Sequence, residues 1–155
     1  MLDQSQWTRK YKTEFFEIPL LENMRVIEIK GDEIKKLKIK YVDNQNSYIF
    51  DLELIKKEGN ISAKELAKSK FALHNHSAFS HENLPPYKYD KQNSNLNAWG
   101  CRFRFVDGGV IAGKMQIIYL ELDHYILMFS FLASPEVFDF GYLILQKLIL
   151  NVNTV

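Results

Sequence analysis

Three of the chain's four histidines fall within one short polar stretch, and they are the first residues whose types could do chemistry. His74, His76 and His81 carry imidazoles, which bind zinc and other divalent ions, and the carboxylate of Glu82 stands beside them. Their spacing matches no standard zinc pattern, and no cysteine lies nearby. The pattern therefore favours solvated loop histidines, with a small metal-binding protein as an alternative function.

Three basic residues form the second candidate site. Arg102 and Arg104 alternate with apolar and aromatic residues, which predicts a strand with both arginines on one face and the apolar set on the other. Lys114 lies on the next expected strand, where it can approach this face. A salt-bridged solvent face is the usual interpretation of such a pattern. The functional interpretation is a docking patch for an acidic partner.

Residues 74–96 are polar, lack a clear period and predict a long loop. Connections in compact domains usually have about 4–6 residues, so a loop of this length is either functional or loosely ordered. Pro85 and Pro86 could instead pin it as a crossover. If the loop is ordered, it would present Tyr87 and Tyr89, which could serve an immunity or inhibitor protein that neutralises a toxin.

Catalytic motifs are absent from the sequence, so we predict a non-enzymatic protein without a cofactor. The segment from Gly108 to Lys114 has the letters of a phosphate-binding loop. However, Met115 replaces the serine or threonine that holds magnesium, and strands are expected on both sides of the glycines. Cys101 alternates in phase with Trp99, which indicates a buried structural thiol and not a nucleophile.

The elements that must position these residues follow from periodicity and punctuation. Apolar alternation predicts four strands, a helix, three strands and a final helix, at residues 14–18, 24–30, 37–41, 48–54, 62–73, 99–105, 110–121, 125–132 and 135–151. Ser62 and Glu65 form a capping box at the start of the first helix. This order predicts an α+β fold, an antiparallel sheet of about six to seven strands with helices packed on it.

Two of these strands have a distinctive composition. Residues 125–132 are apolar on both faces, which predicts a central strand covered on both sides. Lysines alternate with apolar residues through residues 35–40, which predicts a charged edge strand.

Composition limits the class of protein. The length of 155 residues predicts one domain, and a net charge of +1 gives no reason to expect nucleic-acid binding. A single cysteine rules out an internal disulfide. The first ten residues lack the apolar core of a secretory signal, and no segment is apolar enough to span a membrane. We therefore expect a cytoplasmic protein that does not bind membranes.

The order of elements resembles the PsbP-like fold, which photosystem oxygen-evolving subunits and bacterial DcrB-like proteins share. The resemblance is carried by an early strand ending at Pro19, a helix after the fourth strand, and the closing segment from Tyr125 to Asn151. It implies an α/β/α sandwich that binds proteins, as a bacterial cytoplasmic member of the family would. Some such members serve as chaperones or adaptors for type VI secretion effectors. The implied partner is an effector or a toxin, and a homodimer is an option.

Overall fold

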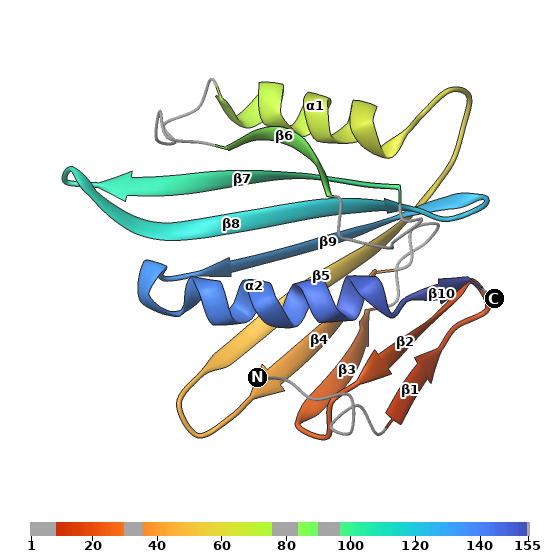
Figure 1. The fold of residues 1–155 in the computed structure, drawn as a ribbon, viewed down its shortest axis with the longest axis horizontal. Helices are drawn as coiled ribbons and strands as arrows, with labels where there is room; N and C mark the ends of the chain where they lie inside the picture. The colour runs from red at the N-terminus through yellow and green to blue at the C-terminus, as the bar shows by residue number, and fades with distance from the viewer. Residues whose placement is uncertain (1–8, 30–35, 76–83, 90–96, 155) are drawn as a thin grey trace.

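The computed structural model describes residues 9–29, 36–75, 84–89 and 97–154 (Figure 1). Two helices and ten strands follow one another along this part of the chain. They are β1 (Arg9–Lys12), β2 (Phe16–Leu20), β3 (Met24–Ile29), β4 (Lys36–Val42), β5 (Ser47–Lys56), α1 (Ala63–Asn75), β6 (Leu84–Tyr89), β7 (Ala98–Asp107), β8 (Val110–Glu121), β9 (Tyr125–Ala133), α2 (Pro135–Leu150) and β10 (Asn153–Thr154).

A seven-stranded antiparallel sheet forms the centre of the fold, in the order β3-β4-β5-β9-β8-β7-β6. Strands β7, β8 and β9 are consecutive hairpins, and the first turns at Gly108 and Gly109, both with positive φ. Glycine adopts this conformation without steric cost, as the sequence predicted. The pairing of β5 with β9 joins the two halves of the sheet. The α+β class and the antiparallel sheet are thus confirmed.

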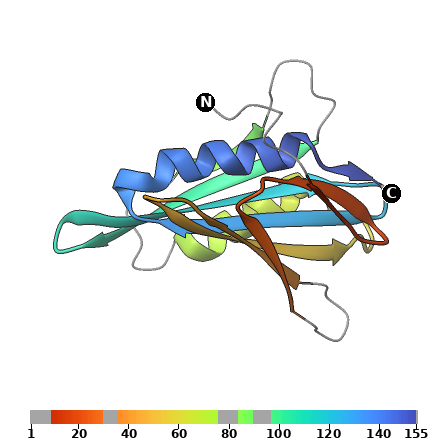
Figure 2. The same ribbon diagram turned by 90° about the horizontal axis from the view of Figure 1, so that it is seen from below.

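The two helices lie on opposite faces of this sheet, so the molecule has three layers (Figure 2). Helix α2 packs on β8 and β9, whereas α1 packs mainly on β6, β7 and β8. The larger core lies on the α2 side and includes Phe50, Phe129 and Phe138, each at most 1% exposed. A smaller core lies under α1 around Cys101 and Phe103. The single cysteine is therefore buried, as its alternation predicted.

A second, three-stranded sheet in the order β1-β2-β10 packs beside α2. Its central strand β2 buries Phe16, Ile18 and Leu20 in the larger core. Pro19 lies within β2 and does not end it, because β10 pairs with β2 only at Phe16 and Glu17 and leaves the edge of β2 at Pro19 open.

Three local expectations differ from the structure. Residues 84–89 form strand β6, so the expected loop 74–96 is interrupted by a strand. Two prolines are accommodated there because β6 is the edge strand and its register shifts between Leu84 and Tyr87. The lysine-rich strand β4 is not the edge, since β3 pairs outside it. Strand β9 is central in the sheet, as predicted. However, Leu132 is 56% exposed on the α1 side, so β9 is covered along its full length on its α2 side only.

Candidate functional site

A buried side-chain amide organises the polar groups on the α2 side of the sheet. Gln116 of β8 is fully buried, and its amide nitrogen donates to the Tyr87 hydroxyl at 3.0 Å and to the Cys101 carbonyl at 3.1 Å. Its side-chain oxygen accepts a hydrogen bond from the Arg102 Nε at 2.8 Å. Every polar atom of this buried amide is thus partnered, as a low-dielectric interior requires.

Two of the predicted basic residues converge on one aromatic ring of α2. The Arg102 guanidinium lies 4.7 Å from the ring centroid of Phe138 and 4.8 Å from that of Tyr142. The Lys114 ammonium lies 5.5 Å from the same Phe138 centroid. Cations at these distances are attracted to the ring faces. Arg104 pairs with Lys114 across β7 and β8, so the three basic residues share one face as predicted.

Tyr87 joins this cluster from the edge strand β6. Its hydroxyl lies 3.1 Å from that of Tyr142, and its ring packs over Gly100, where an added Cβ would come within 3.1 Å of the ring. Burial, followed by the Tyr142 hydrogen bond, raises the pKa of Tyr87 well above its usual value. The structure thus brings Tyr87, Arg102 and Lys114 together, but around contacts that stabilise the domain. Tyr89 ends β6 and pairs with Ala98.

The predicted metal-binding residues are only partly described. His74 lies in the last turn of α1, whereas His76 and His81 fall outside the described residues. Within the ranges that the structure describes, no group of three histidine, cysteine, aspartate or glutamate side chains could hold a metal ion. The histidine site therefore stays a prediction.

A second candidate site is the half of the sheet on which α1 does not pack. Four large apolar side chains point outward there: Ile27 of β3 is 50% exposed, Val42 of β4 46%, Ile49 of β5 46% and Leu132 of β9 56%. We call this surface the open half-face, and its charged members are Arg25, Lys36, Lys38, Lys40, Asp51 and Glu53. Lys38 and Asp51 form an ion pair at 2.6 Å in its middle.

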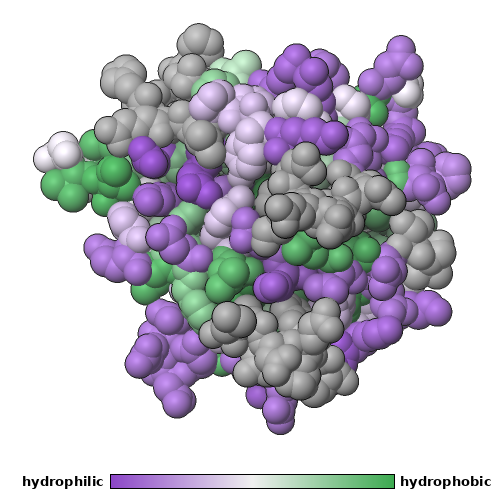
Figure 3. Space-filling model, viewed as in Figure 1, coloured by the Kyte–Doolittle hydropathy of each residue, from purple (hydrophilic) through white to green (hydrophobic). Residues whose placement is uncertain are grey.

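The opposite side of the molecule also carries apolar surface. Figure 3 shows the α2 side, with apolar surface at the projecting tip of the β7–β8 hairpin and in patches nearer the middle of the view. Val106 and Val110 are the exposed apolar residues of that tip, at 40% and 69%. Because this patch is small, the open half-face is the better candidate for a partner.

A pocket of about 180 Å³ adjoins the open half-face beneath α1. It is walled mainly by apolar side chains of β7, β8 and β9, and its lining residues are Lys70, Phe103, Phe105, Met115, Ile117, Met128 and Ser130. Ser130 stands at the border with the open half-face, directly opposite Asp51 of β5. No sequence pattern predicts this pocket, because residues of four elements form it.

Solved structures with similar folds can now be compared. The solution structure of cyanobacterial PsbP (CyanoP) from Synechocystis sp. PCC 6803 matches with a TM-score of 0.66 at 7% identity, covering 95% of this chain and 92% of that chain. The chain has a PsbP-like fold. LpqN, involved in cell envelope biogenesis of Mycobacterium tuberculosis, matches with a TM-score of 0.60 at 12% identity, covering 90% of this chain and 83% of that chain.

A protein of Bacteroides thetaiotaomicron also shares this PsbP-like fold, with a TM-score of 0.57 at 12% identity over 96% of this chain and 49% of that chain. No protein-family model matches the sequence, and the search of curated proteins found no match. At such low identities the similarity establishes the fold alone. The expected kinship with DcrB-like proteins stays a prediction.

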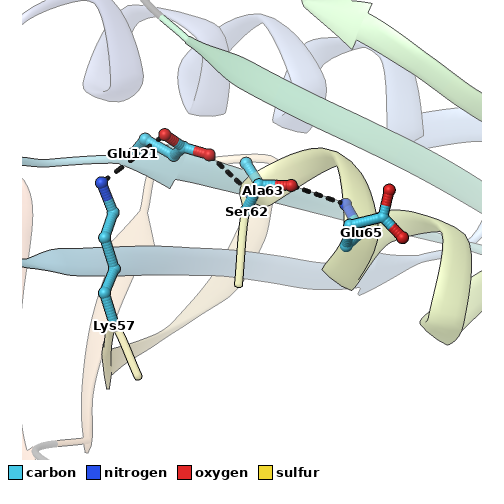
Figure 4. A network of polar contacts seen from close by, with 5 residues as sticks. All are labelled: Lys57, Ser62, Ala63, Glu65 and Glu121. Carbon is cyan, nitrogen blue, oxygen red and sulfur yellow. Dashed lines mark hydrogen bonds and ion pairs between the residues drawn. The ribbon is translucent and has the colours of Figure 1, made fainter. Parts of the chain in front are cut away.

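Within this PsbP-like fold, α1 is fixed at its N-terminus by a polar network (Figure 4). The Glu121 carboxylate of β8 accepts a hydrogen bond from the Ala63 amide at 2.7 Å and lies 3.5 Å from the Lys57 ammonium. The Ser62 hydroxyl accepts a hydrogen bond from the Glu65 amide at 3.2 Å, as the capping box predicted. The network fixes the start of α1 at the end of β8, and the packing of the helix on β6, β7 and β8 places it over that half of the sheet.

Proposed function

We propose that this chain is a non-enzymatic protein-binding domain whose open half-face receives an apolar segment of its partner. The observation that carries this proposal is the clustering of exposed apolar side chains on one sheet face. The described residues have eight exposed large apolar side chains, and four of them lie on the open half-face. Exposed apolar side chains that gather on one face, among polar residues, are characteristic of interaction sites.

Charge on the open half-face limits what it can bind. Its apolar side chains Ile49 and Leu132 lie on β5 and β9, and basic side chains of β3 and β4 lie beside them. Asp51 is occupied by Lys38, so the border carries a positive excess from Arg25 and Lys40. A complementary partner has an apolar stretch flanked by acidic residues. Interfaces of this composition, with an apolar core and a charged rim, are typical of specific complexes.

The finer proposal is that the domain is a cytoplasmic chaperone or adaptor for secretion-system effectors in bacteria. An effector that must cross a membrane carries apolar segments, and these must be shielded from water before export. The open half-face supports this role, since it offers an apolar surface on a rigid sheet. Among the described residues, no helix is long and apolar enough to cross a membrane.

The test is a comparison of partner capture by three tagged proteins in extracts of the native cells. The wild type should retain one dominant protein, identified by mass spectrometry, which has an apolar segment. Leu132→Lys should reduce its recovery at least tenfold, because a charge then faces the apolar centre of the interface. Val110→Lys, at the β7–β8 tip, is the matched control and should retain the partner fully. Equal capture by all three proteins would reject the open half-face as the binding site.

A second candidate function is an inhibitor that neutralises a toxin, and the basic face of β7 and β8 supports it. Arg102, Arg104 and Lys114 lie on that face, on the side of the sheet opposite the open half-face. A toxin with an acidic surface would dock there. In the same capture experiment, Lys114→Glu would then abolish recovery of a small toxin while Leu132→Lys would leave it unchanged.

A further inference from the structure

The pocket beneath α1 combines apolar walls with one positive charge. Phe105, Met115 and Met128 supply apolar surface, and Lys70 of α1 lines the pocket from the side of the helix. In the described part of the chain, Lys70 has no ion pair and no hydrogen bond from its ammonium. Lys70 thus places a positive charge, unpaired among the described residues, at the wall of an apolar pocket.

The size of the pocket limits the ligand. An apolar cavity of about 150 Å³ in an engineered protein binds benzene, and this pocket measures about 180 Å³. One aromatic ring or a short alkyl chain would therefore fill it. The two methionines suit such a ligand, since the flexible thioether side chain adapts to irregular apolar shapes.

The charges around the pocket limit the ligand further. Ser130 offers a hydroxyl that makes no hydrogen bond within the described residues. The carboxylates nearest to the β9 wall belong to Asp51 and Glu53, which face Ser130 and Met128 across β5 and β9. Lys38 forms an ion pair with Asp51, and Lys36 faces Glu53 across β4 and β5, so Lys70 is the charged residue among those that line the pocket. A monoanion with its head toward α1 matches this single positive charge.

We propose that this pocket binds a small monocarboxylate with an apolar body, whose ring or chain fills the space between Met115 and Met128 and whose carboxylate pairs with Lys70. Ser130 is placed to donate a second hydrogen bond to the carboxylate. The proposal stands apart from the function proposed for the open half-face, because a small acid can occupy the pocket whether or not a protein partner binds next to it.

The test is a titration of the full-length protein, labelled at its methionine methyl groups, with benzoate, benzyl alcohol and benzylamine. Benzoate should shift the signals of Met115 and Met128 in a saturable way, and benzylamine should bind at least tenfold more weakly. Octanoate distinguishes between the two kinds of ligand that would supply a carboxylate with an apolar body, an acyl chain and a small aromatic acid. Tighter binding of octanoate than of benzoate indicates an acyl chain that extends past the pocket, and the reverse indicates a small aromatic acid.

Lys70→Met removes the charge while keeping an apolar stem. It should weaken benzoate binding about tenfold and leave benzyl alcohol unchanged. Lys68→Met, which alters an exposed lysine of the same helix, is the matched control and should change neither. If neither acid gives a saturable shift, or if the Lys70 variant binds benzoate as tightly as the wild type, the proposal is wrong. Ile27→Lys, on the open half-face but on β3 and away from the pocket, should weaken capture of the protein partner and keep the acid site, so the two proposals fail separately.

Discussion

The buried amide of Gln116 and the hydroxyl of Tyr87 are joined by a hydrogen bond of 3.0 Å, although 29 positions separate them in the sequence. Strand β7 lies between their strands, so the bond ties the edge strand β6 to β8 across a neighbour. Tyr142 of α2 completes the connection at 3.1 Å. Edge strand, sheet and helix therefore share one polar junction.

Tyr87→Phe should destabilise the domain by roughly 1 kcal/mol, because the hydrogen bonds of the Tyr87 hydroxyl with Gln116 and Tyr142 are lost, although the Gln116 amide keeps the carbonyls of Cys101 and Ile117 as acceptors. Chemical denaturation measures this free energy of unfolding. Tyr125→Phe is the control, since no hydrogen bond of its hydroxyl is found in the described structure, and it should change stability by less than about 0.5 kcal/mol. Equal effects of the two substitutions would show that the junction contributes nothing.

Gly141→Ala should destabilise the protein even though alanine is the better helix former. A Cβ at this position of α2 would lie 2.6 Å from a ring carbon of Tyr48 and 2.9 Å from one of Phe131. The overpacking costs about 1–3 kcal/mol, which outweighs a gain of about 1 kcal/mol in helix propensity. Thermal unfolding of Gly113→Ala provides the comparison, because a Cβ there meets nothing closer than 3.5 Å.

Glu121→Ala should loosen α1, because it removes the acceptor of the Ala63 amide and the partner of Lys57. The expected loss of stability is about 1–2 kcal/mol, and amide hydrogen exchange should quicken in the first turn of α1. Asp123→Ala changes an exposed carboxylate two residues away and should leave that exchange as it is. Unchanged protection of α1 in the Glu121 variant would contradict the anchoring role of this network.

The Cys101 thiol should make the free energy of unfolding of the domain depend on pH in the alkaline range. Burial raises the pKa of Cys101 to about 12, whereas an unfolded thiol titrates near 8.5. Above about pH 8.5 the unfolded chain loses this proton and the folded chain keeps it. The free energy of unfolding should therefore fall as pH rises, by about 1.4 kcal/mol per unit at most.

The measurement is a series of urea denaturation curves between pH 7 and pH 10.5, with the wild type compared with Cys101→Ala. The alanine variant starts from a lower stability, because its smaller side chain leaves a void, but it lacks the thiol. The free energy of unfolding of the alanine variant should fall less steeply with pH than that of the wild type, and the difference between the two slopes is the contribution of the thiol. Parallel slopes would mean that Cys101 does not titrate differently in the folded and unfolded states.

Local patterns were sufficient to predict the elements that depend on neighbouring residues. Alternation placed Arg102 and Arg104 on one face of β7, and the two glycines at 108 and 109 predicted the β7–β8 turn. The strand at Leu84–Tyr89 could not be predicted, because two prolines in a row argue against a strand until the edge position is known. Edge position is a property of the whole sheet.

The candidate site could be predicted only in part, for a similar reason. Basic residues and Tyr87 were singled out by type, but their partner Gln116 carries no signal in its sequence context. The open half-face depends on which strands α1 covers, and that depends on the pairing of β5 with β9. Ile49 and Leu132 are ordinary strand residues until this pairing exposes them on one surface.

The order of strands in the large sheet also sets the sequence of events during synthesis. Strands β8 and β9 lie in the middle of the sheet, yet the ribosome makes them after β3, β4, β5, β6 and β7. Until β9 emerges, β5 has an unpaired edge on a growing chain, and such edges invite pairing with other chains. A nascent-chain chaperone that shields β5 would therefore matter most in the interval between the translation of Lys56 and that of Tyr125.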